Sequence, residues 1–117
     1  MLWSVEDGRD DQLVVLKYPY FDHEEPLVFD EDATYVETDV SFTHTVSHSW
    51  NHGLGAIVTG LLDAGMEITG LVEHDSVPWN ALPGQMEQVP DKGGEWRLID
   101  RPERLPHSYT LQAVKKG

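Results

Sequence analysis

The spacing of apolar residues changes twice between residues 36 and 74, and this change constrains the fold more than any other feature. Apolar or histidine side chains alternate with polar ones from 36 to 50, V-E-T-D-V-S-F-T-H-T-V-S-H-S-W. This alternation predicts a long strand whose buried face contains His44 and His48. The next apolar residues recur at intervals of three and four, as on one face of a helix: Leu54, Ile57, Val58, Leu61 and Leu62. Met66–His74 returns to a strand pattern.

The turn residues around this stripe frame one main helix from about 52 to 64. Ser49 or Asn51 is expected as its N-cap, and Gly65 as the residue just past its C-terminus. A strand, a helix and a second strand then follow each other, which predicts an α+β fold for a single partial domain over 1–117.

The remaining segments predict short strands and a long loop. Leu13–Lys17, Leu27–Phe29 and Tyr109–Val114 have the length and composition of strands. Pro78, Pro83, Pro90 and the pair Gly93-Gly94 make 77–107 a long loop, with one short strand at Trp96–Ile99. The sheet is therefore expected to be mixed or antiparallel.

Composition excludes several classes of protein. The chain has 21 acidic and 8 basic side chains, a net charge of −13, and such a surface repels nucleic acid. No cysteine is present, which excludes disulfides and thiolate metal sites. No apolar run is long enough to cross a membrane and no signal pattern opens the chain, so we expect a cytoplasmic protein without membrane contact.

Three histidines spaced four apart, His44, His48 and His52, suggest a metal site, but geometry disfavours it. Four residues of a strand span roughly 13 Å, too far for two ligands that each lie about 2 Å from one ion. We expect no metal. A hydrogen-bonded, half-buried histidine is the favoured interpretation of His44, whereas His48 and His52 have either that role or a role in a pocket.

Two other motifs are weak. G-L-G at 53–55 follows a strand and opens a helix, as in dinucleotide-binding loops, but its third glycine would fall at Val58. His74, Asp75 and Ser76 are the residue types of a hydrolytic triad, yet adjacent residues cannot form its relay. They do end a strand, where open α/β sheets place ligand-binding groups, so Glu73, His74, Asp75 and Trp79 are pocket candidates; a surface loop is the alternative.

Two segments resemble a known family. W-N-H-G-L-G-A-I-V-T-G-L-L-D-A-G-M-E-I-T-G-L-V-E-H-D spans 50–75, and L-P-H-S-Y-T-L-Q-A-V-K-K spans 105–116. Together they are similar to the C-terminal portion of class I S-adenosylmethionine-dependent methyltransferases of the small-molecule type. In that family a Trp-Asn-His turn enters the last helix, followed by a strand, an excursion and an antiparallel final strand preceded by Leu-Pro.

The resemblance implies the C-terminal half of a Rossmann-like methyltransferase fold. Met1–Trp3 would end the fifth strand, Met66–His74 would be the sixth, and Tyr109–Val114 the antiparallel seventh, inserted beside the fifth. S-adenosylmethionine would be the cofactor of the full-length enzyme. No acidic-x-Gly-x-Gly-x-Gly segment is present, so we expect no cofactor on this chain alone.

The resemblance adds acceptor-side residues to those found from the pattern. The turn into the last helix would contribute His48, Trp50, Asn51 and His52, and the segment that covers the acceptor would contribute Tyr20 and His23. No catalytic residue is identified. The full set of pocket candidates is Tyr20, His23, His48, Trp50, Asn51, His52, Glu73, His74, Asp75 and Trp79.

Two hypotheses follow. In the first, the chain is the C-terminal fragment of a methyltransferase that acts on a small-molecule acceptor, and it is inactive alone. Its partner would be a missing N-terminal half; without that half, exposed apolar surface would drive formation of a homo-oligomer. In the second, it is a free-standing module that binds a small ligand or another protein without catalysis.

Overall fold

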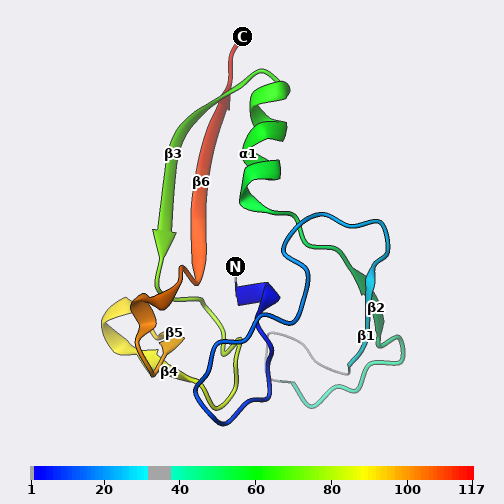
Figure 1. Ribbon diagram of the computed structural model, residues 1–117, viewed down its shortest axis with the longest axis vertical. Coiled ribbons are helices and arrows are strands. Elements are labelled where there is room, and N and C mark those ends of the chain that lie inside the picture. The colour runs from blue at the N-terminus through cyan, green and yellow to red at the C-terminus, as the bar shows by residue number, and fades with distance from the viewer. Residues whose placement is uncertain (1, 32–37) are drawn as a thin grey trace.

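The computed structural model describes residues 2–31 and 38–117 as a mixed α+β fold with one α-helix and three separate antiparallel strand pairs (Figure 1). In chain order the elements are a 3-10 turn Leu2–Ser4, β1 Leu27–Asp30, β2 Val46–Ser49, α1 Leu54–Asp63, β3 Met66–His74, β4 Met86–Val89, a 3-10 turn Pro90–Lys92, β5 Glu95–Leu98, a 3-10 turn Pro102–Arg104 and β6 Ser108–Lys115. β1 pairs with β2, β3 with β6, and β4 with β5. No helix of the described residues is both long and apolar enough to cross a membrane.

The helix and the strand after it lie where the apolar pattern predicts them. α1 ends at Asp63 with Ala64 as its C-cap, and the chain turns at Gly65, whose φ of 76° favours glycine. The predicted N-cap was wrong, because Gly53 occupies that position and makes no side-chain cap bond. The tight turn sends β3 back along α1, and the two elements pack together (Figure 1).

The longest strand pairing joins β3 to β6, and both strands are confirmed. Met66 lies opposite Lys115 and His74 opposite Ser108, with a bulge between Ile68 and Gly70. Along β6 the half-buried residues Tyr109, Leu111 and Ala113 alternate with exposed ones. The pair therefore has one apolar face, which α1 covers from β3.

The long strand predicted over 36–50 was wrong in extent. Residues 36 and 37 lie outside the described residues, 38–45 form no strand, and only Val46–Ser49 is extended. His44 and His48 are exposed, so the expected buried histidine face does not exist. The alternation of apolar and polar residues specifies which side chains share a face, but a strand forms only where a partner strand completes its hydrogen bonds. The partner strand that the structure describes, β1, offers four residues, so β2 has four residues as well.

Two predictions near the N-terminus were also wrong. Leu13–Lys17 is not a strand, although Leu16 forms a single antiparallel bridge with Val5. Met1 lies outside the described residues, and Leu2–Ser4 is a 3-10 turn, not the end of a strand. Leu2 and Val5 are buried in the hydrophobic core. This segment therefore contributes apolar side chains to the core and not a strand to a sheet.

The segment 77–107 is more regular than the predicted long loop. It contains the hairpin of β4 and β5, in which β5 confirms the expected short strand near Trp96. Gly93 and Gly94, with φ of 67° and 80°, close the hairpin after a one-turn 3-10 helix. Pro90 lies just after β4, a position that needs no ladder hydrogen bond, so the proline is compatible with the sheet.

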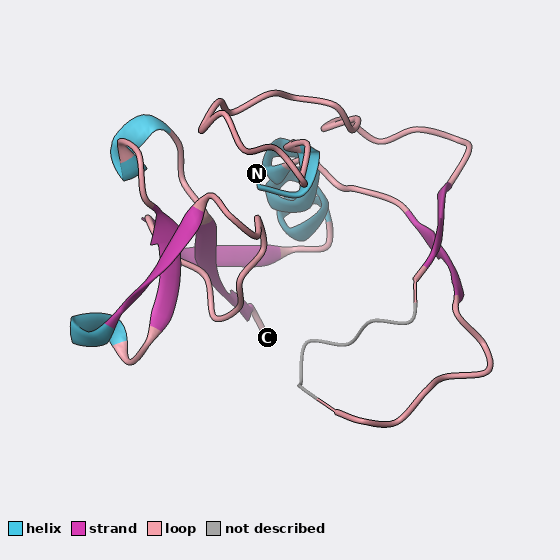
Figure 2. Ribbon diagram, turned by 90° about the horizontal axis from the view of Figure 1, so that it is seen from below, coloured by secondary structure: helices cyan, strands magenta, loops and turns pink. Residues whose placement is uncertain are grey.

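The hydrophobic core lies between the N-terminal segment and this hairpin. Its buried apolar residues are Leu2, Val5, Val77, Leu82, Met86 and Leu98, with Val14, Ala81, Trp96 and Leu105 packed against them. No residue of α1 is buried, and the apolar residues of β3 and β6 are at best half-buried. The core therefore holds one end of the molecule while the α1–β3–β6 unit extends from it (Figures 1 and 2).

The chain exposes more surface than a compact protein of its size. Its accessible surface is 8281 Å², against roughly 6,400 Å² for a compact monomer of this mass. Its radius of gyration is 16.4 Å, against about 13 Å for a compact domain of this length. Much of the surplus is apolar, with Leu62, Val72 and Val114 between 50% and 55% exposed.

We expect Leu98→Ala to lower the free energy of unfolding by about 2–5 kcal/mol, because Leu98 is 1% exposed at the centre of the core. Leu62→Ala is the matched control: Leu62 is 53% exposed, and its loss should cost about 0.5 kcal/mol or less. Urea denaturation followed by circular dichroism measures both. Equal effects of the two substitutions would contradict the location of the core.

Candidate functional site

The N-terminus of α1 is built around Tyr20. The Tyr20 hydroxyl accepts the backbone N–H of Leu54 at 2.9 Å, and its carbonyl accepts the side-chain amide of Asn51 at 2.5 Å. Gly53 is buried beside the ring, where an added Cβ would lie 3.2 Å from Tyr20 Cε1. Tyr20 thus supplies the cap that Gly53 lacks, and the glycine allows its ring to approach the helix.

An open hollow of about 260 Å³ lies beside this end of the helix. Its residues come from the segment before β1, from the turn into α1 and from one side of the helix: Asp22, His52, Ala56, Ile57, Gly60 and Leu61. His52 Nδ1 lies 3.3 Å from Asp22 Oδ2, and the two side chains are 64% and 55% exposed. The hollow therefore combines one polar pair at its rim with an apolar wall.

The nearby candidates make mainly structural contacts. Trp50 donates its indole N–H to the carbonyl of Glu24 at 3.2 Å. His23 Nδ1 contacts the carbonyl of Glu25. The Trp50 bond holds the segment before β1 against the turn into α1, whereas the His23 contact stays within that segment. Neither side chain lines the hollow. His48 also lies outside it, exposed on β2 opposite Val28.

The candidates at the end of β3 form a separate group that does not line the hollow. His74 Nε2 lies 2.8 Å from Thr110 Oγ1, and Asp75 forms an ion pair with Lys92. The hydrogen bond from Lys92 and the positive charge of its ammonium group lower the pKa of the Asp75 carboxyl. Glu73 and Trp79 are exposed, Trp79 to 40%. The pattern thus predicted two sets of residues, and only Tyr20, Asn51 and His52 gather at one end of the helix.

His107 is the buried titratable group that the sequence did not reveal. It is 3% exposed, and its Nε2 accepts the backbone N–H of Leu98 at 3.1 Å. The ring proton therefore lies on Nδ1, which donates to the Leu105 carbonyl at 3.0 Å. Burial lowers the pKa of His107 below its ordinary value of 6.5. No local pattern marks this residue, because its burial depends on a strand nine positions earlier.

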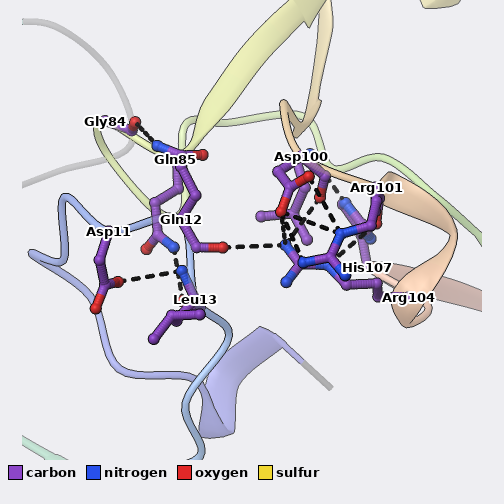
Figure 3. A network of polar contacts seen from close by, with 10 residues as sticks. Asp11, Gln12, Leu13, Gly84, Gln85, Asp100, Arg101, Arg104 and His107 are labelled. Carbon is purple, nitrogen blue, oxygen red and sulfur yellow. Dashed lines mark hydrogen bonds and ion pairs between the residues drawn. The ribbon is translucent and has the colours of Figure 1, made fainter.

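A polar network joins the N-terminal segment to 84–104 (Figure 3). Gln85 is fully buried and donates to the Leu13 carbonyl at 2.8 Å, while Gln12 donates to the Gly84 carbonyl at 3.0 Å. Arg104 donates to the carbonyls of Gln12, at 3.4 Å, and Asp100, at 2.8 Å. Because the main partners are backbone carbonyls, this network holds segments together and offers no converging reactive groups.

Neither a metal nor a nucleotide site is assembled by the residues that the structure describes. Among them, no three His, Asp or Glu side chains converge as ligands for a metal ion. The ring of Tyr20 lies against Gly53 of G-L-G, so a phosphate has no access to that glycine. The hollow with its Asp22–His52 pair is therefore the candidate site, and its lining offers hydrogen-bonding groups at the rim and apolar contact along the helix.

Comparison with protein-family models, with curated proteins and with solved structures gives no match to this chain. The functional assignment consequently depends on the residues and contacts described above.

We expect Tyr20→Phe to lower the free energy of unfolding by about 1 kcal/mol, because the Leu54 N–H loses its acceptor while the ring stays against Gly53. Thermal denaturation measures the loss, and the Leu54 amide should show the largest change in chemical shift. Tyr109→Phe is the control, because it removes the same hydroxyl group from β6 and leaves the acceptor of the Leu54 N–H in place. Equal losses in both variants would contradict the capping role.

We expect stability to fall as the pH drops below about 6.5, because the unfolded chain binds a proton at His107 more readily than the folded chain. Between the two pKa values, unfolding takes up a proton, so the free energy of unfolding decreases with decreasing pH. His107→Gln removes this proton uptake and should flatten the dependence between about pH 7 and pH 5. Urea denaturation at several pH values tests it; an unchanged slope in the variant would contradict the assignment.

Proposed function

We propose that this chain is the acceptor-side, C-terminal portion of an S-adenosylmethionine-dependent methyltransferase that acts on a small molecule, and that it is inactive alone. The observation that supports this most is the order and direction of its last elements. α1 turns tightly into β3, an excursion follows, and β6 returns antiparallel to β3. The methyltransferases that the sequence resembles have the same succession at their C-terminus.

The unpaired strand edge agrees with this proposal. Among the described residues no strand pairs with β6 on the side away from β3. In the resembled family the final strand lies beside the fifth strand. Leu2–Ser4 is a 3-10 turn and not the end of that strand, so the fifth strand is assigned to the proposed N-terminal half. The surplus of roughly 1,900 Å² of exposed surface over a compact monomer is of the size that such a half would cover.

The hollow at the start of α1 is the proposed acceptor site. The Asp22–His52 pair would hydrogen-bond the polar group of the acceptor, and Ile57 and Leu61 would contact its apolar part. In methyl transfer, holding the nucleophile against the donor methyl accounts for much of the rate. S-adenosylmethionine would supply that methyl. Its binding is assigned to the proposed N-terminal half, because this sequence lacks the acidic-x-Gly-x-Gly-x-Gly loop of the resembled family.

The test is reconstitution. The coding sequence upstream should encode about 120 residues of β-α units with a glycine-rich first loop, as the proposal requires. That segment and the present chain, purified together, should transfer label from S-adenosylmethionine to a small-molecule acceptor, while neither part does so alone. A stop codon upstream with no such segment nearby would contradict the proposal.

In the reconstituted enzyme, we expect His52→Ala to raise the KM for the acceptor about tenfold, because the acceptor loses a polar contact. His44→Ala is the matched control, since His44 is exposed and does not line the hollow. An unchanged KM in the first variant would place the acceptor elsewhere without contradicting the division into two parts.

A free-standing ligand-binding module is the second candidate. The hollow is formed entirely by residues of this chain, so a ligand does not need another segment to bind there. In this case the isolated chain would bind its ligand with undiminished affinity, and no upstream segment would convert it into an enzyme.

A further inference from the structure

The outer edge of β6 is open and unprotected. Ser108–Lys115 is an eight-residue strand without proline, without a bulge on its own chain, and without a charged side chain before Lys115. On the side away from β3 it pairs with no strand in the described parts of the chain. Natural proteins usually block such edges with charges, prolines, bulges or covering segments, because a free ladder of N–H and C=O groups recruits another strand.

The outer edge of β3 carries the protection that β6 lacks. Its bulge between Ile68 and Gly70 interrupts the ladder, and Glu67 and Glu73 lie near its ends. If two copies of β3 paired antiparallel over their whole length, Glu67 of each copy would lie opposite Glu73 of the other. Like charges placed directly opposite each other destabilise a strand pair. Of the two edges of this sheet, β6 is therefore the one built to accept a strand.

From these features we propose that the chain by itself, without the N-terminal half of the proposed function, forms a dimer in which β6 pairs antiparallel with β6 of a second copy. The product is a four-stranded sheet in the order β3, β6, β6, β3. Two antiparallel copies are related by a two-fold axis perpendicular to the sheet, so both helices lie on the same face. The axis also places odd-numbered residues of β6 opposite odd-numbered residues of its copy, which continues the half-buried face of Tyr109, Leu111 and Ala113 across the interface.

One register suits these residues best. With Leu111 on the axis, Tyr109 lies opposite Ala113 on the face of the helices, and Thr110 lies opposite Gln112 on the other face. Aromatic–aliphatic and hydroxyl–amide pairs are favourable cross-strand neighbours. Lys115, the one charged residue of the strand, then falls beyond the paired positions, so no like charges meet.

The exposed area fits a second copy as the occupant. A stable interface of standard size buries about 800 Å² on each partner. The accessible surface of 8281 Å² exceeds that of a compact monomer by more than this amount. The net charge of −13 opposes association at long range, so the dimer should tighten as added salt screens the repulsion.

The test uses the full chain and two double variants with the same positions changed. Thr110→Lys with Gln112→Lys places like charges opposite each other twice across the axis. Thr110→Lys with Gln112→Glu places opposite charges there instead. Both variants equally lose the contact of Thr110 with His74. Sedimentation equilibrium at tens of micromolar should show a dimer for the unmodified chain, a dissociation constant raised about tenfold or more in the first variant, and a retained dimer in the second.

Two results would overturn the proposal. The first is a monomeric unmodified chain at these concentrations, at both low and high salt. The second is a dimer that the like-charged variant does not weaken, since pairing through β6 could not tolerate it. Far-UV circular dichroism of both variants controls for folding, and amide exchange in β6 that slows as the protein concentration rises would locate the contact independently.

Discussion

The contact between the N-terminal segment and the β4–β5 hairpin organises this molecule. It joins residues more than 70 positions apart, through the burial of Leu2 and Val5 against Leu98 and through the hydrogen bond from Gln85 to Leu13. The same region holds the ends of the long strand pair. His107 accepts the Leu98 N–H with its ring and donates its backbone N–H to His74 at 2.7 Å. The hairpin, the start of β6 and the end of β3 are therefore joined by one buried histidine, through its imidazole and its backbone N–H.

From this anchored end, the α1–β3–β6 unit extends with little burial of its own. The helix buries no residue completely, and isolated helices of this length are marginal in water, so packing must stabilise it. Part of that packing comes from β3, and part from the Tyr20 cap. Apolar residues of the unit, such as Leu62 and Val114, are still about half exposed, so the unit has apolar surface that a partner could bury. Either proposed occupant of the β6 edge, a donor-binding half or a second copy, would complete the hydrogen bonds of that edge and cover apolar surface beside it.

Local patterns predicted those elements that local chemistry determines. α1 and β3 follow from their apolar periods and from Gly65, whose positive φ ends the helix regardless of the rest of the chain. The strand predicted over 36–50 fails because alternation describes which side chains share a face, not whether a neighbour exists. β4 was missed because Pro83 and Pro90 suggest irregular chain, although both lie outside the strand they flank. His107 was missed because its environment is made by Leu98 and Leu105 across a turn.

The candidate site shows the same division between local and long-range information. The turn residues Asn51 and His52 could be singled out from their position before the helix. Their partners, Tyr20 and Asp22, lie about 30 positions earlier. The resemblance suggested Tyr20, but no local pattern suggested Asp22 or either contact. Gly53 favours the pairing of the two segments, because an added Cβ would lie 3.2 Å from Tyr20 Cε1, a tight approach that would require the ring to shift. A glycine at the N-cap, which has no side chain to cap the helix, thus leaves room for the Tyr20 hydroxyl to accept the Leu54 N–H.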